Sequence, residues 1–145
     1  MSRKKARAAA LQALYALDVG RIPEEVALNH VVEENGLAPS DAAFTRTLVS
    51  GVLQHRQRLD ELLAQYAIGW EVERMPVVDR NILRLGLYEL LYLREEIPAS
   101  VSINEAIELA KVFSNEEAGP FINGVLDSIR RDLDAGKPED ETAGG

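Results

Sequence analysis

Apolar side chains recur at intervals of three and four residues along nearly the whole chain, and sustained alternation of apolar and polar residues is absent. A helix brings positions three and four apart onto one face, whereas a half-buried strand requires alternation. The sequence therefore predicts an all-α fold, a compact bundle of six to seven helices. The length of 145 residues and a hydrophobic content of 46% suit a single compact domain.

The first two helices are expected over residues 3–17 and Glu24–Glu34. Pro23 precedes the second helix and Gly36 follows it, which is the usual placement of these two residues at helix ends. Both ends of the second helix are therefore marked in the sequence.

Hydroxyl side chains suggest the starts of two later helices. Ser40 is a candidate cap for a long third helix, which has room for a break near Gly51. Ser102 stands three residues before Glu105, and this spacing matches a capping box. We expect each serine to satisfy backbone N–H groups at a helix start.

Residues 78–93 are apolar almost all the way round a helix, which predicts an element enclosed by its neighbours. Glu89 lies on a side of this helix that is otherwise apolar, so its carboxylate requires a hydrogen-bond donor. Arg80, Arg84, a tyrosine hydroxyl or a backbone N–H could supply it. We interpret Glu89 as a satisfied structural acid, because no second catalytic group accompanies it.

The composition excludes several kinds of chemistry. The absence of cysteine rules out disulfides, thiolate metal sites and cysteine nucleophiles, and it fits a cytoplasmic location. His30 and His55 have no metal-ligand spacing, and the chain has no glycine-rich phosphate loop. We therefore expect no enzymatic activity, metal or cofactor. No run approaches 18 consecutive apolar residues, so no membrane span is expected.

Charge is unevenly distributed. The net charge is −8, yet the first 58 residues carry 8 basic and 6 acidic side chains, against 8 and 18 in the remaining 87. Four cations lie within five residues: Arg3, Lys4, Lys5 and Arg7. Some of them lie on the same side of the first helix as its apolar residues. Unpaired cations cannot enter a core. We expect this turn to project beyond the core edge, as a polyanion-binding tip or as a frayed terminus.

Three aromatic residues are candidates for stacking on unpaired RNA bases: Tyr15, Trp70 and Phe121. Helical spacing makes each of them more often a core residue. Phe121 follows Gly119 and Pro120 at a helix start, where a ring can be half exposed, and it is the strongest of the three.

The end of the chain differs from the rest. We expect residues 1–133 to form one domain. Residues 134–145 are rich in glycine and acidic side chains and lack apolar periodicity, which predicts a disordered acidic tail.

Several motifs occur in order: RKKARAAALQALYALD near the start, then DRNILRLGLYELL, Ile97-Pro98, VSINEAIELAK and FINGVLD. Together they cover about residues 3–130 and resemble the NusB family of bacterial transcription antitermination factors. The resemblance implies an all-helical fold of two small bundles packed together, with no enzymatic activity.

The resemblance also implies partners. Members bind the boxA element of ribosomal RNA leader transcripts as a heterodimer with the small-subunit ribosomal protein NusE. With RNA polymerase and other Nus factors, this pair suppresses premature termination in rRNA operons. The RNA-binding residues it implies are Arg3, Lys4, Lys5, Arg7, Tyr15 and Phe121. The partner-binding residues it implies are Asp79, Glu117 and Phe121.

Two alternatives remain. A similar domain precedes the catalytic part of an rRNA cytosine methyltransferase, but that enzyme requires a cofactor domain and a catalytic cysteine, which this chain lacks. The other alternative is a helical protein-interaction module with an incidental basic tip.

Overall fold

The computed structural model describes residues 3–136. Within this range it contains seven α-helices and one short 3-10 helix: α1 Lys4–Val19, α2 Glu24–Glu34, α3 Pro39–Gln54, α4 Arg56–Tyr66, η1 Val72–Arg74, α5 Val77–Tyr92, α6 Ala99–Phe113 and α7 Ala118–Asp134. No strand occurs in the described residues. The all-α prediction is confirmed, and α2 has the expected bounds.

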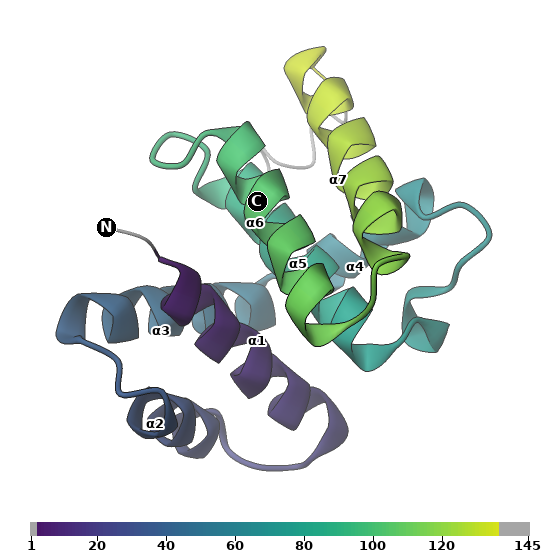
Figure 1. The fold of residues 1–145 in the computed structure, drawn as a ribbon. Helices are drawn as coiled ribbons and strands as arrows, with labels where there is room; N and C mark the ends of the chain where they lie inside the picture. Colours follow the sequence, from purple (N-terminus) through teal and green to yellow (C-terminus); the bar gives the residue numbers. More distant parts are fainter. Residues whose placement is uncertain (1–2, 137–145) are drawn as a thin grey trace.

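The helices form two small bundles that share one core (Figure 1). The first bundle consists of α1, α2 and α3, and the second of α4, α5, α6 and α7. Helix α5 contacts helices of both bundles, because α1 and α3 of the first bundle and α4, α6 and α7 of the second all pack against it. The two-bundle architecture implied by the family resemblance is therefore present.

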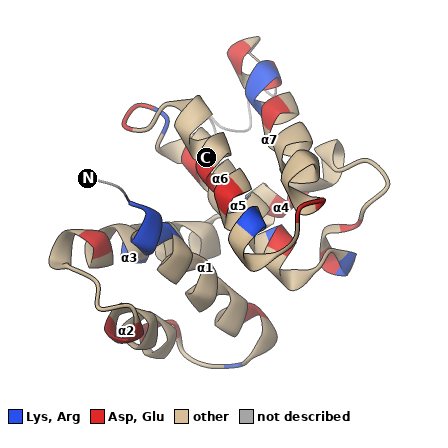
Figure 2. Ribbon diagram, viewed as in Figure 1, with Lys and Arg blue, Asp and Glu red and all other residues tan. Residues whose placement is uncertain are grey.

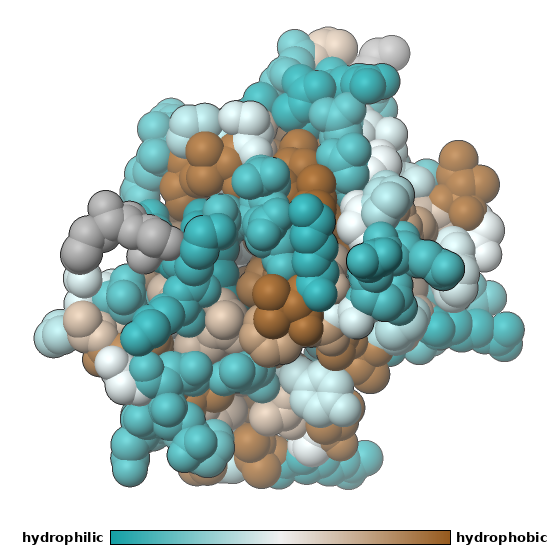
Figure 3. Space-filling view, in the orientation of Figure 1, coloured by the Kyte–Doolittle hydropathy of each residue, from teal (hydrophilic) through white to brown (hydrophobic). Residues whose placement is uncertain are grey.

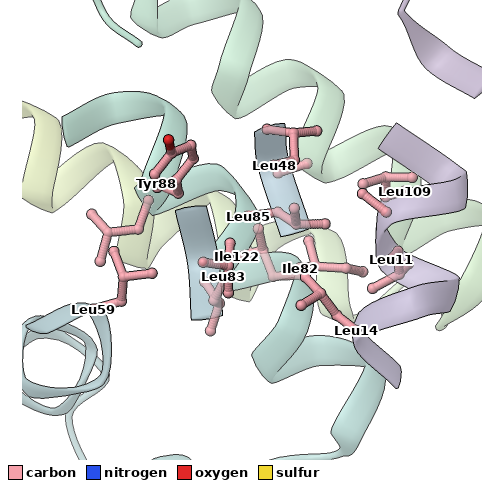
Figure 4. Packing of buried hydrophobic residues seen from close by; sticks show 14 of the residues in the cluster. Leu11, Leu14, Leu48, Leu59, Ile82, Leu83, Leu85, Tyr88, Leu109 and Ile122 are labelled. Carbon is pink, nitrogen blue, oxygen red and sulfur yellow. The ribbon is translucent and has the colours of Figure 1, made fainter. Parts of the chain in front are cut away.

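Helix α5 is buried continuously over residues 81–90, as its apolar sequence predicts. Leu11 and Leu14 of α1 lie close to Ile82 and Leu85 of α5 in the packed interior (Figure 4). Full burial of such a side chain contributes about 1.5–3 kcal/mol. Hydrophobic packing therefore joins the two bundles through α5.

The break between α3 and α4 lies at His55, four residues beyond the expected position at Gly51. Gly51 instead permits a close approach between helices. A Cβ atom at this position would lie 2.1 Å from a ring carbon of Tyr88. The ring of His55 stacks on Tyr92 with a centroid distance of 4.2 Å, so the junction packs against the C-terminal half of α5.

Both serine caps are wrong predictions. Helix α3 begins at Pro39, before Ser40, and α6 begins directly after Pro98, before Ser102. Proline fixes the backbone torsion that suits the start of a helix, so the prolines determine these starts. Ser102 lies one turn inside α6, where its hydroxyl donates to Glu89 Oε1 at 2.7 Å.

Charged groups connect α1 to α5 near both ends of α1. At the C-terminal end, the guanidinium of Arg80 donates to both carboxylate oxygens of Asp18, at 2.7 and 2.8 Å, and Arg84 donates to Asp18 at 3.1 Å. Burial raises the pKa of Asp18, but hydrogen bonds from Arg80 and Asn81 and the charges of Arg84 and Arg80 outweigh it and lower the pKa to about 2. Asp18 is therefore a strongly stabilised carboxylate.

The last helix extends to Asp134, one residue into the expected tail. Residues 137–145 lie outside the described residues, and the tail remains a prediction.

Candidate nucleic-acid and protein interface

Three exposed cations lie at the N-terminal end of α1, and we call Arg3, Lys4 and Lys5 the basic turn. The guanidinium carbon of Arg3 lies 4.0 Å from the centroid of the Phe44 ring, which belongs to α3. The Nζ atom of Lys4 lies 3.3 Å from a carboxylate oxygen of Glu105 in α6. The basic turn therefore lies where both bundles meet the N-terminal end of α1.

Arg7 does not project beyond the core edge, and that expectation is wrong. It is 6% exposed, and its Nε and Nη2 atoms donate to the two carboxylate oxygens of Glu89 at 2.8 and 2.9 Å. Glu89 is 2% exposed and also accepts the hydroxyl of Ser102. Glu89 is thus a satisfied structural acid, as expected, although its donors differ from the expected ones.

The electrostatic field at the start of α1 favours an anion. The first turn contains no acidic residue, and the N-terminal end of a helix carries a partial positive charge. Figure 2 shows the basic start of α1 beside acidic positions on α6. Backbone N–H groups, the helix dipole and the basic turn together suit a phosphate.

Tyr15 is separated from the basic turn by about 15 Å along α1, at 1.5 Å per residue. Its side chain is 44% exposed. Tyr15 is accessible to a ligand, and its role in RNA binding stays a prediction.

The three residues expected at the partner edge line one pocket of about 290 Å³. Asp79 lies in the first turn of α5, Glu117 immediately precedes α7, and Phe121 lies in the first turn of α7. Trp70 is half exposed, and its ring lies 6.1 Å from that of Phe121. We call this the edge pocket, since the residues that flank η1 and the N-terminal ends of α5 and α7 line it.

The edge pocket carries negative charge. Asp79 is 8% exposed, and its Oδ1 atom is buried without a hydrogen-bond partner among the described residues. Such an atom is unusual in a folded protein, because an unsatisfied buried acceptor costs about 1–3 kcal/mol. Glu117 is exposed and also lines the pocket, and three further exposed acids lie within two residues of its lining residues in the sequence: Glu71, Glu73 and Glu116. A basic partner would complement this edge.

Apolar side chains are also exposed at the C-terminal end of α6. Figure 3 shows hydrophilic atoms near the N-terminal end of α1 and over the middle of α6, with apolar patches beside them. Val112 is 72% exposed, and Phe113 is 36% exposed. The face between the basic turn and the edge pocket therefore carries both hydrophilic and apolar side chains.

Three contacts between helices at these sites were not predicted from the sequence. Phe44 lies beneath Arg3, Glu105 pairs with Lys4, and Glu89 accepts from Arg7 across a separation of 82 residues. Only the last pair had a signal in the sequence. Arg7 and Glu89 each carry a charge on an apolar helix face, and two such charges can satisfy each other.

The described range offers no other obvious chemistry. Across residues 3–136, no three His, Asp or Glu side chains converge as a metal site. None of the helices in that range combines the length and apolar character needed to cross a bilayer.

An all-helical fold with a cationic helix end and an acidic pocketed edge defines a binding protein. The sequence model of the NusB family matches residues 4–131. The transcription antitermination protein NusB of Bacillus subtilis is 45% identical over 134 residues, which cover 92% of this chain and 98% of that protein.

Solved structures agree with this match. The T. maritima NusB structure has a TM-score of 0.83 and 34% identity, covering 91% of this chain and 92% of that chain. A crystal structure of the antitermination factors NusB and NusE with double-stranded RNA has a TM-score of 0.81 and 29% identity, covering 89% and 96%. The chain therefore belongs to the NusB family, and it is an antitermination factor rather than an enzyme.

Proposed function

We propose that this chain binds boxA RNA of ribosomal RNA leader transcripts together with the ribosomal protein NusE, and so promotes full-length rRNA transcription. The observation that carries this proposal is the juxtaposition of Arg3, Lys4 and Lys5 at the positive end of α1, on a protein whose net charge is −8. The basic turn therefore offers a polyanion a favourable binding place.

The edge pocket supplies the second surface. A basic ribosomal protein would complement the surrounding acids, and one of its donors could satisfy Asp79 Oδ1. The relative that has been crystallised with both NusE and RNA supports a ternary arrangement of this kind. We assign Asp79, Glu117 and Phe121 to the partner surface, with Phe121 also available to RNA.

The RNA surface consists of the basic turn, with Tyr15 at its margin. We leave Arg7 out of the direct contacts, because its side chain is buried and paired with Glu89. Assembly with RNA polymerase and other Nus factors would follow from the RNA and NusE complex, in the cytoplasm.

A direct test compares a single-stranded boxA oligonucleotide with a scrambled one of the same composition, each titrated with and without NusE. The proposal predicts tighter binding of the boxA oligonucleotide and a stable heterodimer with NusE. Equal affinity for both oligonucleotides in both conditions would refute it and favour a protein-interaction module.

A further inference from the structure

Arg7 has a different relation to RNA from the three cations that precede it. We propose that Arg7 is a positioning residue: with Glu89 and Ser102 it fixes the basic turn against α5 and α6, so that Arg3, Lys4 and Lys5 form a preformed patch. This inference rests on the proposed RNA-binding function. It removes Arg7 from the RNA contacts and adds Glu89 and Ser102 to the residues that determine affinity.

The geometry is that of a fully satisfied buried pair. Oε2 of Glu89 accepts Arg7 Nε at 2.8 Å, and Oε1 accepts Arg7 Nη2 at 2.9 Å and Ser102 Oγ at 2.7 Å. Three helices contribute: α1, α5 and α6. A two-pronged guanidinium–carboxylate pair fixes orientation as well as distance. The Nε and Nη2 groups of Arg7 are thus committed to Glu89, and a residue that is 6% exposed offers a phosphate little surface.

Arg7 shares its surroundings with the exposed cations. Its guanidinium carbon lies 5.5 Å from the Phe44 ring centroid, and Arg3 lies over the same ring. Its Nη1 atom lies 3.9 Å from Glu105, which also pairs with Lys4. Two neighbours of the basic turn are therefore also neighbours of Arg7.

The basic turn needs such an anchor. Three cations at the positive end of a helix repel the helix dipole, and the first turn of α1 contains no acid to offset this. This repulsion favours fraying of the turn that RNA must contact. The pair with Glu89 fixes Arg7 one turn further along α1. The basic turn therefore loses less conformational entropy when RNA binds.

Neutralising Glu89 distinguishes a positioning role of Arg7 from direct contact with RNA, because the two roles predict opposite changes in RNA affinity. If Arg7 is a positioning residue, Glu89→Gln weakens binding of the boxA oligonucleotide about two- to tenfold, although it removes a negative charge. If Arg7 is instead a phosphate contact for which Glu89 competes, the same variant tightens binding. The log-log salt slope then becomes steeper by about 0.7, which is the contribution of one phosphate.

A milder variant guards against loss of folding. Ser102→Ala leaves all charges in place and removes one donor to Glu89, so it should weaken RNA binding with an unchanged salt slope. Glu108→Gln is the matched control, because it removes an accessible carboxylate from α6 that pairs with Lys111. We expect it to leave RNA affinity within about twofold of wild type.

The experiment measures RNA affinity at several salt concentrations, with far-UV circular dichroism to confirm folding. Weaker binding in both Glu89→Gln and Ser102→Ala, with the wild-type slope, supports the proposal. Unchanged or tighter binding in either folded variant overturns it. If the wild-type protein does not prefer the boxA oligonucleotide, the proposed function itself has failed, and this outcome is distinct from failure of the positioning role.

Discussion

Replacing Arg3, Lys4 and Lys5 together by alanine should remove most of the salt dependence of RNA binding without loss of stability. Each phosphate neutralised on a single strand contributes about −0.7 to the slope of log affinity against log salt. Three exposed cations predict a slope of about −2 for the wild-type protein, and the buried Arg7 adds nothing. Between 50 and 200 mM salt, affinity should fall about 20-fold.

The stability terms nearly cancel in the triple variant. The Lys4–Glu105 pair, whose lysine side chain is 62% exposed, contributes about 0–1 kcal/mol, and the Arg3–Phe44 contact about 0.5–1 kcal/mol. Removing cations from the positive end of α1 relieves their repulsion with the helix dipole and stabilises the folded protein by about 0.3–1 kcal/mol for each charge. The thermal midpoint should therefore stay within a few degrees of the wild-type value.

Fluorescence anisotropy with a labelled boxA oligonucleotide gives the slope, and thermal unfolding gives the midpoint. Arg21→Ala is the control, since Arg21 is exposed beyond the opposite end of α1. It should leave the slope unchanged. A triple variant that retains a slope near −2 would show that RNA binds elsewhere on the protein.

Three further predictions concern single residues. Asp18 has a lowered pKa, so its contribution to stability is complete above pH 4 and is lost as pH falls through about 2. The difference in unfolding free energy between wild type and Asp18→Asn should therefore shrink over this range. A constant difference would contradict the assignment. Gly51→Ala should cost about 1–3 kcal/mol in urea unfolding because its Cβ would meet the Tyr88 ring, whereas Gly124→Ala, with open space around it, should be neutral or stabilising; equal effects would refute this reasoning. Phe121→Ala should weaken NusE or RNA binding at least fivefold while the protein remains folded, and unchanged affinities for both ligands would remove Phe121 from the interface.

Helical periodicity predicted the fold well because it reports local burial. The even apolar distribution over residues 78–93 identified α5 as the enclosed helix, and Pro23 with Gly36 identified the bounds of α2. Serine caps failed at α3 and α6 because Pro39 and Pro98 already determine those starts. Local signals therefore compete, and spacing alone does not indicate which signal determines a helix end.

The candidate site was predicted in part. The basic segment was visible in the sequence, the family resemblance implied the three partner-edge residues, and the structure places Asp79, Glu117 and Phe121 around one pocket. The pairing of Arg7 with Glu89 depends on how α1 packs against α5, 82 residues further along the chain. Periodicity marks each of the two residues as a charge on an apolar helix face, but it does not show that the two faces meet.

The most direct test of the account is whether RNA and NusE bind cooperatively at the basic turn and the edge pocket. Isothermal titrations of each ligand, with and without the other, should give the same coupling factor in both directions, between about 5 and 150. Asp79→Lys should weaken NusE binding and reduce RNA affinity only when NusE is present. A coupling factor of one in the wild-type protein would contradict the cooperative complex and leave two independent surfaces.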